Sequence, residues 1–198
     1  MIGVVDTGGA NHASILNALE RLGRQAIISL DREELSSCSH LILPGVGHAG
    51  HAMARLNSAG LCEYLRAQSK PVLGICLGMQ ILFDSSAEGA SSCLGLIPGR
   101  VARLSPSPGF QVPHMGWSRL ERRGSPSKLL QGISESAYFY FVHSYAAPLS
   151  EWVTASTPAP QPIASVVEWR NFSAVQFHPE RSGPDGGRLL ENFLTETA

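Results

Sequence analysis

The sequence predicts an α/β fold: a doubly wound, mostly parallel sheet with flanking helices and additional antiparallel strands. In the first half of the chain, short apolar runs alternate with segments whose apolar residues recur at helical spacing, which is typical of parallel strands joined by helices. Two of these runs end in glycine-rich corners, as strands do at the carboxyl edge of an open α/β sheet. In the second half, runs rich in aromatic and β-branched residues follow one another with short connections, which favours antiparallel strands.

Length and composition favour a single domain that spans residues 1–198. The chain has 198 residues, of which 43% are hydrophobic, enough to bury one full core. Charged residues make up only 16% and the net charge is −1, so neither nucleic acid nor an anionic membrane is an expected partner. No apolar segment approaches the length of a membrane span.

The N-terminus and the cysteines indicate a cytoplasmic protein. The first residues lack the basic start and the small-residue cleavage site of a signal peptide. The four cysteines lie far apart and form no C-x-x-C pair, which argues for a reducing compartment and against disulfides or a zinc site. His48 and His51 have the spacing of a possible metal pair, but no third ligand lies near them in the sequence, so no metal is expected.

The expected elements can be placed in order along the chain. Apolar residues at positions 15, 16, 19 and 22 predict a helix that Asn11 caps and Gly23 ends. A second helix is expected at 56–67 and a closing helix at 189–194, after a turn at 183–187. A loop is expected at 85–93. Strands are expected at 2–5, 26–30, 41–43, 72–75, 94–104, 137–145, 152–156, 163–169 and 172–177.

One short stretch carries the strongest chemical signal. Gly74-Ile75-Cys76-Leu77-Gly78 has the pattern G-x-C-x-G, the thiol version of the nucleophile elbow. A strand that turns sharply into a helix holds the nucleophile above the sheet, and glycines on either side make room for neighbouring backbone. An apolar, helix-like continuation runs through Phe83, and its N-terminus would favour the thiolate. A buried structural cysteine between two packing glycines is the alternative for this pentapeptide alone.

A second signal follows the last predicted strand. In His178-Pro179-Glu180, the proline restricts the backbone to a stiff, extended corner, from which the carboxylate can reach back to the imidazole. A thiol, an imidazole and a carboxylate are the attacker, proton carrier and orienting group of a nucleophilic triad. A third signal is the corner Pro44-Gly45-Val46-Gly47, whose exposed N–H groups could receive an oxyanion, although an ordinary tight turn explains it as well.

These motifs resemble those of the class I (triad) glutamine amidotransferases, and more narrowly those of the glutaminase subunits of imidazole glycerol phosphate synthases, which act in histidine biosynthesis. The class-level likeness rests on the corner at 44–47, the elbow with Met79 and Gln80, and Gln176-Phe177-His178-Pro179-Glu180. The narrower likeness rests on residues 113–117, 138–145 and 178–183, which come in the family's order. One departure is the N-terminal loop, where Asp6-Thr7-Gly8 and Ala10-Asn11-His12 replace the commoner Asp-Tyr-Gly and Gly-Asn-Leu.

The resemblance implies an α/β fold and a mechanism without a cofactor. Cys76 would attack the carboxamide of L-glutamine, His178 would carry the proton, and Glu180 would orient His178. Backbone N–H groups of Leu77, Val46 and Gly47 would hold the oxyanion. By family position, glutamine would be bound by Gln80, Glu88 and the backbone of His143, Ser144 and Tyr145.

The resemblance also implies a partner, a cyclase subunit with a (β/α)8 barrel that receives the ammonia within a heterodimer. The cyclase joins the ammonia to a ribonucleotide and yields imidazole glycerol phosphate and AICAR. Trp117, Tyr140 and Arg181 are expected interface residues, because exposed aromatic and guanidinium groups often anchor interfaces. Asn11 is a fourth, because the N-terminal loop lies toward the partner in the family.

Three other interpretations remain open. The chain could belong to another triad amidotransferase, for anthranilate or pyridoxal phosphate synthesis, although residues 113–117 argue against that. It could be a scaffold subunit that has lost turnover, although Cys76, His178 and Glu180 are intact. It could also be a stand-alone thiol hydrolase, which would be fully active without a partner.

Overall fold

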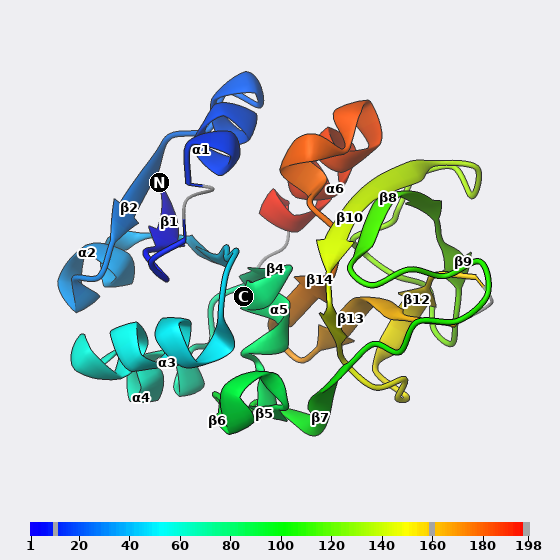
Figure 1. Cartoon of the computed structure of the whole chain (residues 1–198). Coiled ribbons are helices and arrows are strands. Elements are labelled where there is room, and N and C mark those ends of the chain that lie inside the picture. The colour runs from blue at the N-terminus through cyan, green and yellow to red at the C-terminus, as the bar shows by residue number, and fades with distance from the viewer. Residues whose placement is uncertain (10–11, 159–160, 196–198) are drawn as a thin grey trace.

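The structure is a computed structural model that describes residues 1–9, 12–158 and 161–195 (Figure 1). Its centre is an eight-stranded sheet with the strand order β2-β1-β3-β4-β14-β13-β12-β9. The first five strands in this order are parallel: β2 Ala26–Ser29, β1 Ile2–Val5, β3 His40–Leu43, β4 Val72–Ile75 and β14 Phe172–Val175. The remaining three are antiparallel: β13 Ala164–Trp169, β12 Val153–Ser156 and β9 Glu121–Arg122. The predicted fold class is therefore confirmed.

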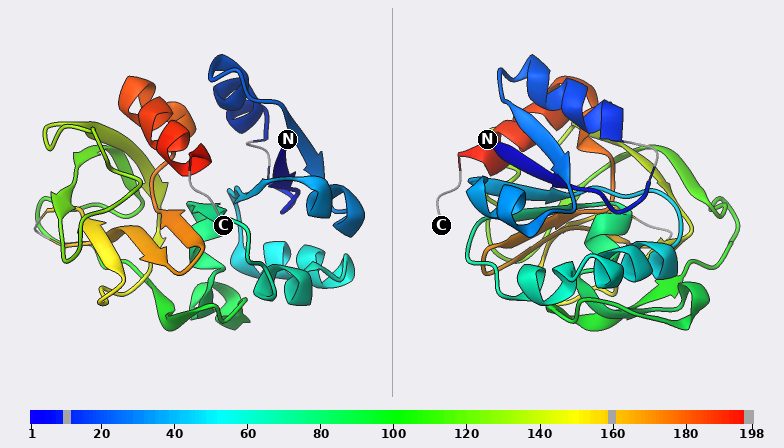
Figure 2. Two further views of the ribbon diagram at one scale, coloured as in Figure 1. Left: turned by 180° about the vertical axis from the view of Figure 1, so that it is seen from behind. Right: turned by 90° about the vertical axis from the view of Figure 1, so that its left-hand side faces the viewer.

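Helices cover both faces of this sheet, as Figures 1 and 2 show. On one face lie α1 (His12–Arg21) and α6 (Gly183–Leu194); on the other lie α2 (Arg32–Ser37), α3 (Ala49–Ser58) and α4 (Leu61–Arg66). Side chains of a strand point alternately to the two faces, so neighbouring residues enter different cores. Val4 packs with the helices α1 and α6, whereas Val5 packs with the other three.

Two smaller sheets complete the fold. One contains β11 (Tyr145–Ala146), β7 (Ile97–Arg103), β5 (Phe83–Ser86) and β6 (Ser91–Ser92), in that order. The other is an antiparallel pair of β8 (His114–Arg119) and β10 (Tyr138–His143). Three short helices remain: α5 (Leu77–Gln80), η1 (Glu88–Ala90) and η2 (Pro179–Arg181).

The topology brings the three sequence signals to one edge. β4 lies between β3 and β14, and Leu43 pairs with Gly74 while Val175 pairs with Ile75. All three strands run parallel, so the segments that follow them leave from the same carboxyl edge. Those segments are the corner at 44–47, the elbow at 74–78 and the segment 176–180.

Several element boundaries differ from the sequence prediction. The helix predicted at 56–67 is interrupted at Gly60, which has the left-handed backbone φ of 68° and separates α3 from α4. The helix after Cys76 ends at Gln80, and the strand β5 begins at Phe83, where the sequence predicts helix and then loop. The closing helix begins at Gly183 instead of 189, because Pro184 is tolerated in a first helical turn. Helix α2 was not predicted from the sequence; Asp31 caps it by accepting hydrogen bonds from two backbone N–H groups.

In the described part of the chain, no helix combines the length and the apolar character needed to cross a bilayer. The four cysteines, Cys38, Cys62, Cys76 and Cys93, are free and buried.

Candidate active site

Cys76 occupies a strained turn between β4 and α5. Its backbone φ is 54° and its ψ is −107°, a conformation that a residue with a side chain rarely adopts. The two glycines of the motif permit the close packing that this turn requires. A Cβ at Gly78 would lie 1.7 Å from the carbonyl oxygen of Leu43, and one at Gly74 would lie 2.8 Å from the carbonyl oxygen of Gly78. Only glycine can therefore occupy these positions without moving the strand β3 or the elbow itself.

His178 and Glu180 form a buried pair beside the thiol. His178 Nδ1 lies 2.8 Å from Glu180 Oε1, and both residues are less than a tenth exposed. The backbone N–H of His178 donates to the carbonyl oxygen of Tyr140 at 2.9 Å, which ties the histidine to β10. With Nδ1 turned to the carboxylate, Nε2 is left for another group, and it makes no hydrogen bond within the described residues.

The surroundings of His178 favour its protonated form. Burial by itself lowers the pKa of the imidazole, but Cys76 and Glu180 raise it, and the net direction is upward. The two groups that raise the pKa are therefore the other two members of the expected triad, the Cys76 thiol and the Glu180 carboxylate, which lies 2.8 Å from Nδ1.

The Cys76 sulfur has two polar neighbours of its own. Sγ lies 3.9 Å from the carbonyl oxygen of Val142 on β10 and 3.7 Å from Nε2 of Gln176. In the sequence, Gln176 stands out only as part of a motif and has no predicted role. Its contact with the sulfur arises because β14 and β4 end side by side, and the local sequence around Gln176 does not indicate this contact.

The corner at 44–47 packs directly against the elbow. A Cβ at Gly45 would lie 2.9 Å from Cβ of Leu77, and Gly47 has a φ of 112°. The N–H of Leu77, an expected oxyanion donor, donates to the carbonyl oxygen of Gly45 at 3.3 Å. Behind the corner, the buried Thr7 hydroxyl donates to the carbonyl oxygen of Pro44 at 2.7 Å, so the atypical N-terminal loop contacts this segment directly.

Among the expected glutamine-binding residues, Gln80 is buried behind the thiol. Its Nε2 donates to the carbonyl oxygen of Tyr145 at 2.8 Å and to Oε1 of Gln176 at 3.0 Å. The same Tyr145 carbonyl lies 2.8 Å from Nδ1 of His143. Gln80 is therefore an internal link between α5, β11 and the end of β14, and is not an exposed helix residue.

His143 is buried and neutral. Burial lowers its pKa to about 3, with smaller contributions from His114 and His178. Its Nε2 lies 3.2 Å from Nδ1 of His114, and the neighbouring Ser144 carbonyl accepts from the N–H of Leu104 at 2.8 Å. The backbone of residues 143–145 is thus fixed by hydrogen bonds within the protein itself.

The Glu88 carboxylate contacts the start of α3. It belongs to η1, and its Oε2 accepts from the N–H of Ala49 at 2.7 Å, at the first residue of α3. A carboxylate at a helix N-terminus is a stabilising arrangement in its own right.

Two of the expected interface residues, Trp117 and Tyr140, lie on one face of the β8–β10 pair. Trp117 is 54% exposed and meets the ring of Tyr140 edge-on, with 5.8 Å between the ring centroids. The guanidinium carbon of Arg181 lies 5.5 Å from the centre of the Tyr140 ring. Asn11 lies outside the described residues.

The same face contains two more exposed side chains that the sequence analysis did not single out. Met115 is 60% and Tyr138 is 50% exposed. The alternation of half-buried and exposed residues along β8 places Met115 on the face that Trp117 occupies. Residues 113–117 were not predicted to be a strand, so the alternation could not be used to find Met115.

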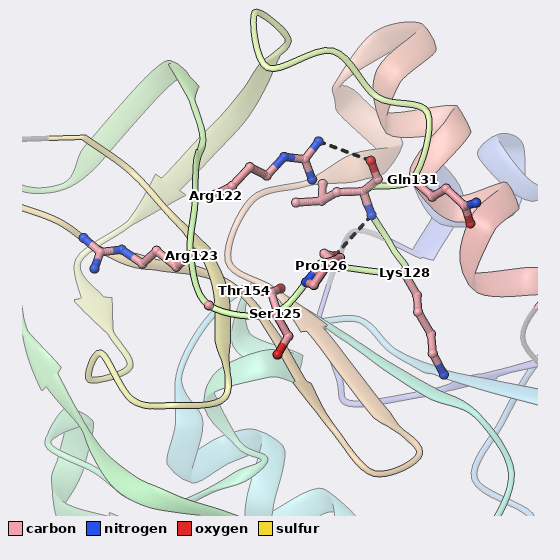
Figure 3. Close-up of a pocket in the computed structure, with 10 residues that line it drawn as sticks. Arg122, Arg123, Ser125, Pro126, Lys128, Gln131 and Thr154 are labelled. Atoms are coloured by element: carbon pink, nitrogen blue, oxygen red, sulfur yellow. Dashed lines mark hydrogen bonds between the residues drawn. The ribbon is translucent and has the colours of Figure 1, made fainter.

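A surface cavity of about 630 Å³ lies elsewhere, beside β9 and β12 (Figure 3). The residues that line it include Arg122, Arg123, Lys128 and Thr154, but no residue of the triad. Arg122 donates to the carbonyl oxygens of Leu130 and Ile133, so its guanidinium holds the loop together. Within the described ranges, no cluster of three or more histidine, cysteine, aspartate or glutamate side chains could hold a metal ion.

Comparison with known proteins agrees with the fold and the motifs. The family model "Glutamine amidotransferase class-I" matches residues 3–197. Among solved structures, a crystal structure of a glutamine amidotransferase has a TM-score of 0.75 at 23% identity, covering 98% of this chain and 96% of its own. A chain in the structure of PurLQS from Thermotoga maritima has a TM-score of 0.68 at 20% identity, covering 98% of this chain and 96% of its own.

Curated relatives give the narrower assignment. The imidazole glycerol phosphate synthase subunit HisH of Xylella fastidiosa (strain Temecula1) is 48% identical over 194 residues, which are 98% of this chain and 96% of the relative. The HisH subunit of Xanthomonas euvesicatoria pv. vesicatoria is 47% identical over 193 residues, with the same coverage. The chain belongs to the class I glutamine amidotransferases. Within that class it is a member of the HisH family of imidazole glycerol phosphate synthase subunits, and the resemblance inferred from the motifs is confirmed.

Proposed function

We propose that this chain is the glutaminase subunit of a cytoplasmic imidazole glycerol phosphate synthase. As a single domain of residues 1–198, it hydrolyses L-glutamine to glutamate and ammonia and delivers the ammonia to a cyclase subunit. The observation that carries this proposal is the meeting of Cys76 with the buried His178–Glu180 pair at one edge of the sheet. Family membership supplies the substrate and the pathway.

The first half of the reaction forms a thioester. The Cys76 thiol transfers its proton to His178 Nε2, and the thiolate attacks the side-chain carbonyl carbon of glutamine. The tetrahedral oxyanion accepts hydrogen bonds from the N–H groups of Leu77, Val46 and Gly47. His178 then gives its proton to the departing nitrogen, so ammonia leaves and the γ-glutamyl group stays on the sulfur.

The second half of the reaction regenerates the enzyme. His178 takes a proton from water, and the resulting hydroxide attacks the thioester carbon. The carbon–sulfur bond breaks, glutamate leaves, and the proton returns to Cys76. Glu180 orients the imidazole and stabilises its charged form in both halves, as the 2.8 Å contact with Nδ1 supports.

We assign glutamine binding to the region between the elbow and β11. Gln80 and the backbone of His143, Ser144 and Tyr145 form the wall behind the thiol, held by the Tyr145 carbonyl that accepts from Gln80 and His143. Glu88 uses Oε2 to accept from Ala49, and its negative charge attracts the α-ammonium group of glutamine.

The partner in this proposal is a (β/α)8-barrel cyclase that binds the exposed face of the β8–β10 pair in a heterodimer. An exposed indole, a phenol ring and a guanidinium in contact, as in Trp117, Tyr140 and Arg181, are typical of interface anchors. The strand β10 of this face also contacts the triad, because the Tyr140 carbonyl accepts from the N–H of His178. Asn11 in the N-terminal loop is proposed as a further contact.

Partner binding also offers a way to control the chemistry. In the structure the Leu77 N–H donates to the Gly45 carbonyl at 3.3 Å, so it does not point freely at an oxyanion. We propose that occupation of the cyclase reorients a peptide in the 44–47 corner and frees this donor. Gly47, at a φ of 112°, has the backbone freedom that such a change needs.

Ammonia release from glutamine tests this function. Wild type and Cys76→Ala are each assayed alone and with the cyclase and its nucleotide ligand. Activity that appears in the complex and is abolished in Cys76→Ala supports a partner-dependent glutaminase. Full activity of the isolated chain indicates a stand-alone hydrolase, and no activity under any condition indicates a scaffold subunit.

A further inference from the structure

Two buried glutamine side chains connect the strand β11 to the reacting sulfur. Gln80 is 4% exposed and Gln176 is fully buried. Nε2 of Gln80 donates to Oε1 of Gln176 at 3.0 Å, and Nε2 of Gln176 lies 3.7 Å from Sγ of Cys76. Buried amides that satisfy one another in this way hold their positions, because each loses a hydrogen bond if it turns away.

The direction of every hydrogen bond in this series is fixed by one backbone group. The carbonyl oxygen of Tyr145 can only accept, so the atom of Gln80 that lies 2.8 Å from it must be the NH₂ group. That same NH₂ group meets Gln176, which must therefore present its oxygen to Gln80. The NH₂ group of Gln176 is then the end that faces the Cys76 sulfur.

We propose that Gln176 is a further catalytic residue, whose amide N–H donates to Cys76 Sγ and stabilises the thiolate, and that Gln80 is the positioning residue that aims it. This inference rests on the proposed glutaminase function. A thiolate accepts hydrogen bonds more strongly than a thiol, so a fixed N–H donor favours the charged nucleophile. The helix that follows Cys76 has only four residues, and its dipole is correspondingly short.

This assignment separates two tasks at the nucleophile. Gln176 is neutral at every pH and stabilises the sulfur anion without exchanging a proton. His178, oriented by Glu180, remains free to carry the proton from the thiol to the leaving nitrogen. The titratable groups near the sulfur are His178, its partner Glu180, and the neutral His143. These three also influence the ionisation of the thiol, and they are the same in wild type and in the Gln176 variants.

The ionisation of the Cys76 thiol provides the test. The rate of Cys76 alkylation by iodoacetamide is measured against pH in the full chain, by peptide mass spectrometry. Gln176→Leu removes the donor at similar volume, and Gln176→Glu replaces it with a carboxylate. We expect alkylation of Cys76 near neutral pH to be about tenfold slower in Gln176→Leu than in wild type, because the thiolate loses a hydrogen-bond donor. The slowing should be greater in Gln176→Glu, and both rates should approach wild type at high pH.

Gln131→Glu is the matched control, since it makes the same charge change at an exposed position that does not contact the triad. Gln80→Leu keeps Gln176 but removes its anchor, and a smaller slowing is expected. Thiolate absorbance, taken as the difference between each variant and its Cys76→Ala counterpart, follows the same ionisation without requiring access for a reagent.

A folded Gln176→Leu variant whose pH profile matches that of wild type overturns the inference, whatever its thermal stability. If circular dichroism shows that this variant does not fold, Gln176→Met is held to the same expectation and Gln80→Leu to the smaller slowing stated for it. Neither glutamine nor the cyclase enters these measurements. A wild type that releases no ammonia, yet shows the Gln176-dependent profile, would therefore contradict the proposed function and the catalytic role, and leave only the hydrogen bond from Gln176 to the sulfur standing.

Discussion

The N–H of Leu77 donates to the carbonyl oxygen of Gly45 at 3.3 Å. One expected oxyanion donor is therefore hydrogen-bonded to the corner 44–47, which is expected to supply the other donors. The two groups meet because β3 and β4 are parallel neighbours and both end at this edge. In the proposed mechanism this contact must open before the oxyanion forms. The backbone freedom of the 44–47 corner is therefore expected to control turnover.

Substitution of Gly47 by alanine tests that expectation. A Cβ at Gly47 would meet nothing within 4 Å, so the effect comes from its φ of 112° and not from a clash. The backbone strain in Gly47→Ala is about 1–3 kcal/mol. Loss of an oxyanion donor lowers kcat by about 10²–10³-fold. We expect Gly47→Ala to lower kcat of the complex with the cyclase by more than the strain lowers stability. Gly23→Ala is the control, with positive φ and open space but no contact with the corner: it should lose stability and keep kcat.

The raised pKa of His178 predicts a pH dependence of stability. A group whose pKa is higher in the folded protein stabilises it fully below the unfolded pKa of about 6.5, and this contribution is lost as the pH rises through the folded value. Glu180→Gln removes the carboxylate that raises the pKa. The difference in unfolding free energy between wild type and Glu180→Gln should therefore be larger at pH 6 than at pH 9. Urea unfolding at the two pH values measures it, and a difference that grows with pH would contradict the assignment.

The predictable part of the site consists of residues whose chemistry is tied to their immediate neighbours. Cys76 could be found because its strained turn demands glycines two positions away on either side, a local constraint. His178 and Glu180 could be found because their contact spans only two residues around a proline. The sheet was predictable for a similar reason, since each strand is a short apolar run with its own boundaries.

The parts that escaped prediction depend on distant contacts or on marginal local signals. Gln176 acquires its place beside the sulfur only because β14 pairs with β4, about a hundred residues away in the chain. Glu88 becomes a helix cap only because η1 packs near the start of α3. The interruption at Gly60 and the helical start at Gly183 both concern glycines, whose backbone freedom is compatible with several structures.

The depressed pKa of His143 predicts acid sensitivity of the opposite sign to that of His178. Its folded pKa is about 3 and its unfolded pKa is about 6.5, so between these values the unfolded chain binds a proton that the folded protein does not. As the pH is lowered over that range, His143 should reduce the free energy of unfolding by about 1.4 kcal/mol for each pH unit. In His143→Gln this part of the slope should disappear. Urea unfolding between pH 6.5 and 4.5 measures it, with the same substitution at the exposed His51 as control.

The last prediction concerns the exposed face of the β8–β10 pair. Trp117→Ala should weaken association with the cyclase about 30-fold, because loss of a central aromatic anchor typically costs about 2 kcal/mol. Trp117 is 54% exposed, so its loss should leave thermal stability nearly unchanged. Ile28→Ala is a matched control: Ile28 is 38% exposed and lies on β2, an edge strand at the far end of the sheet order from β9. Titration calorimetry with the cyclase measures both affinities. Equal affinities of Trp117→Ala and wild type would mean that the cyclase binds elsewhere, and would reject this face as the docking surface.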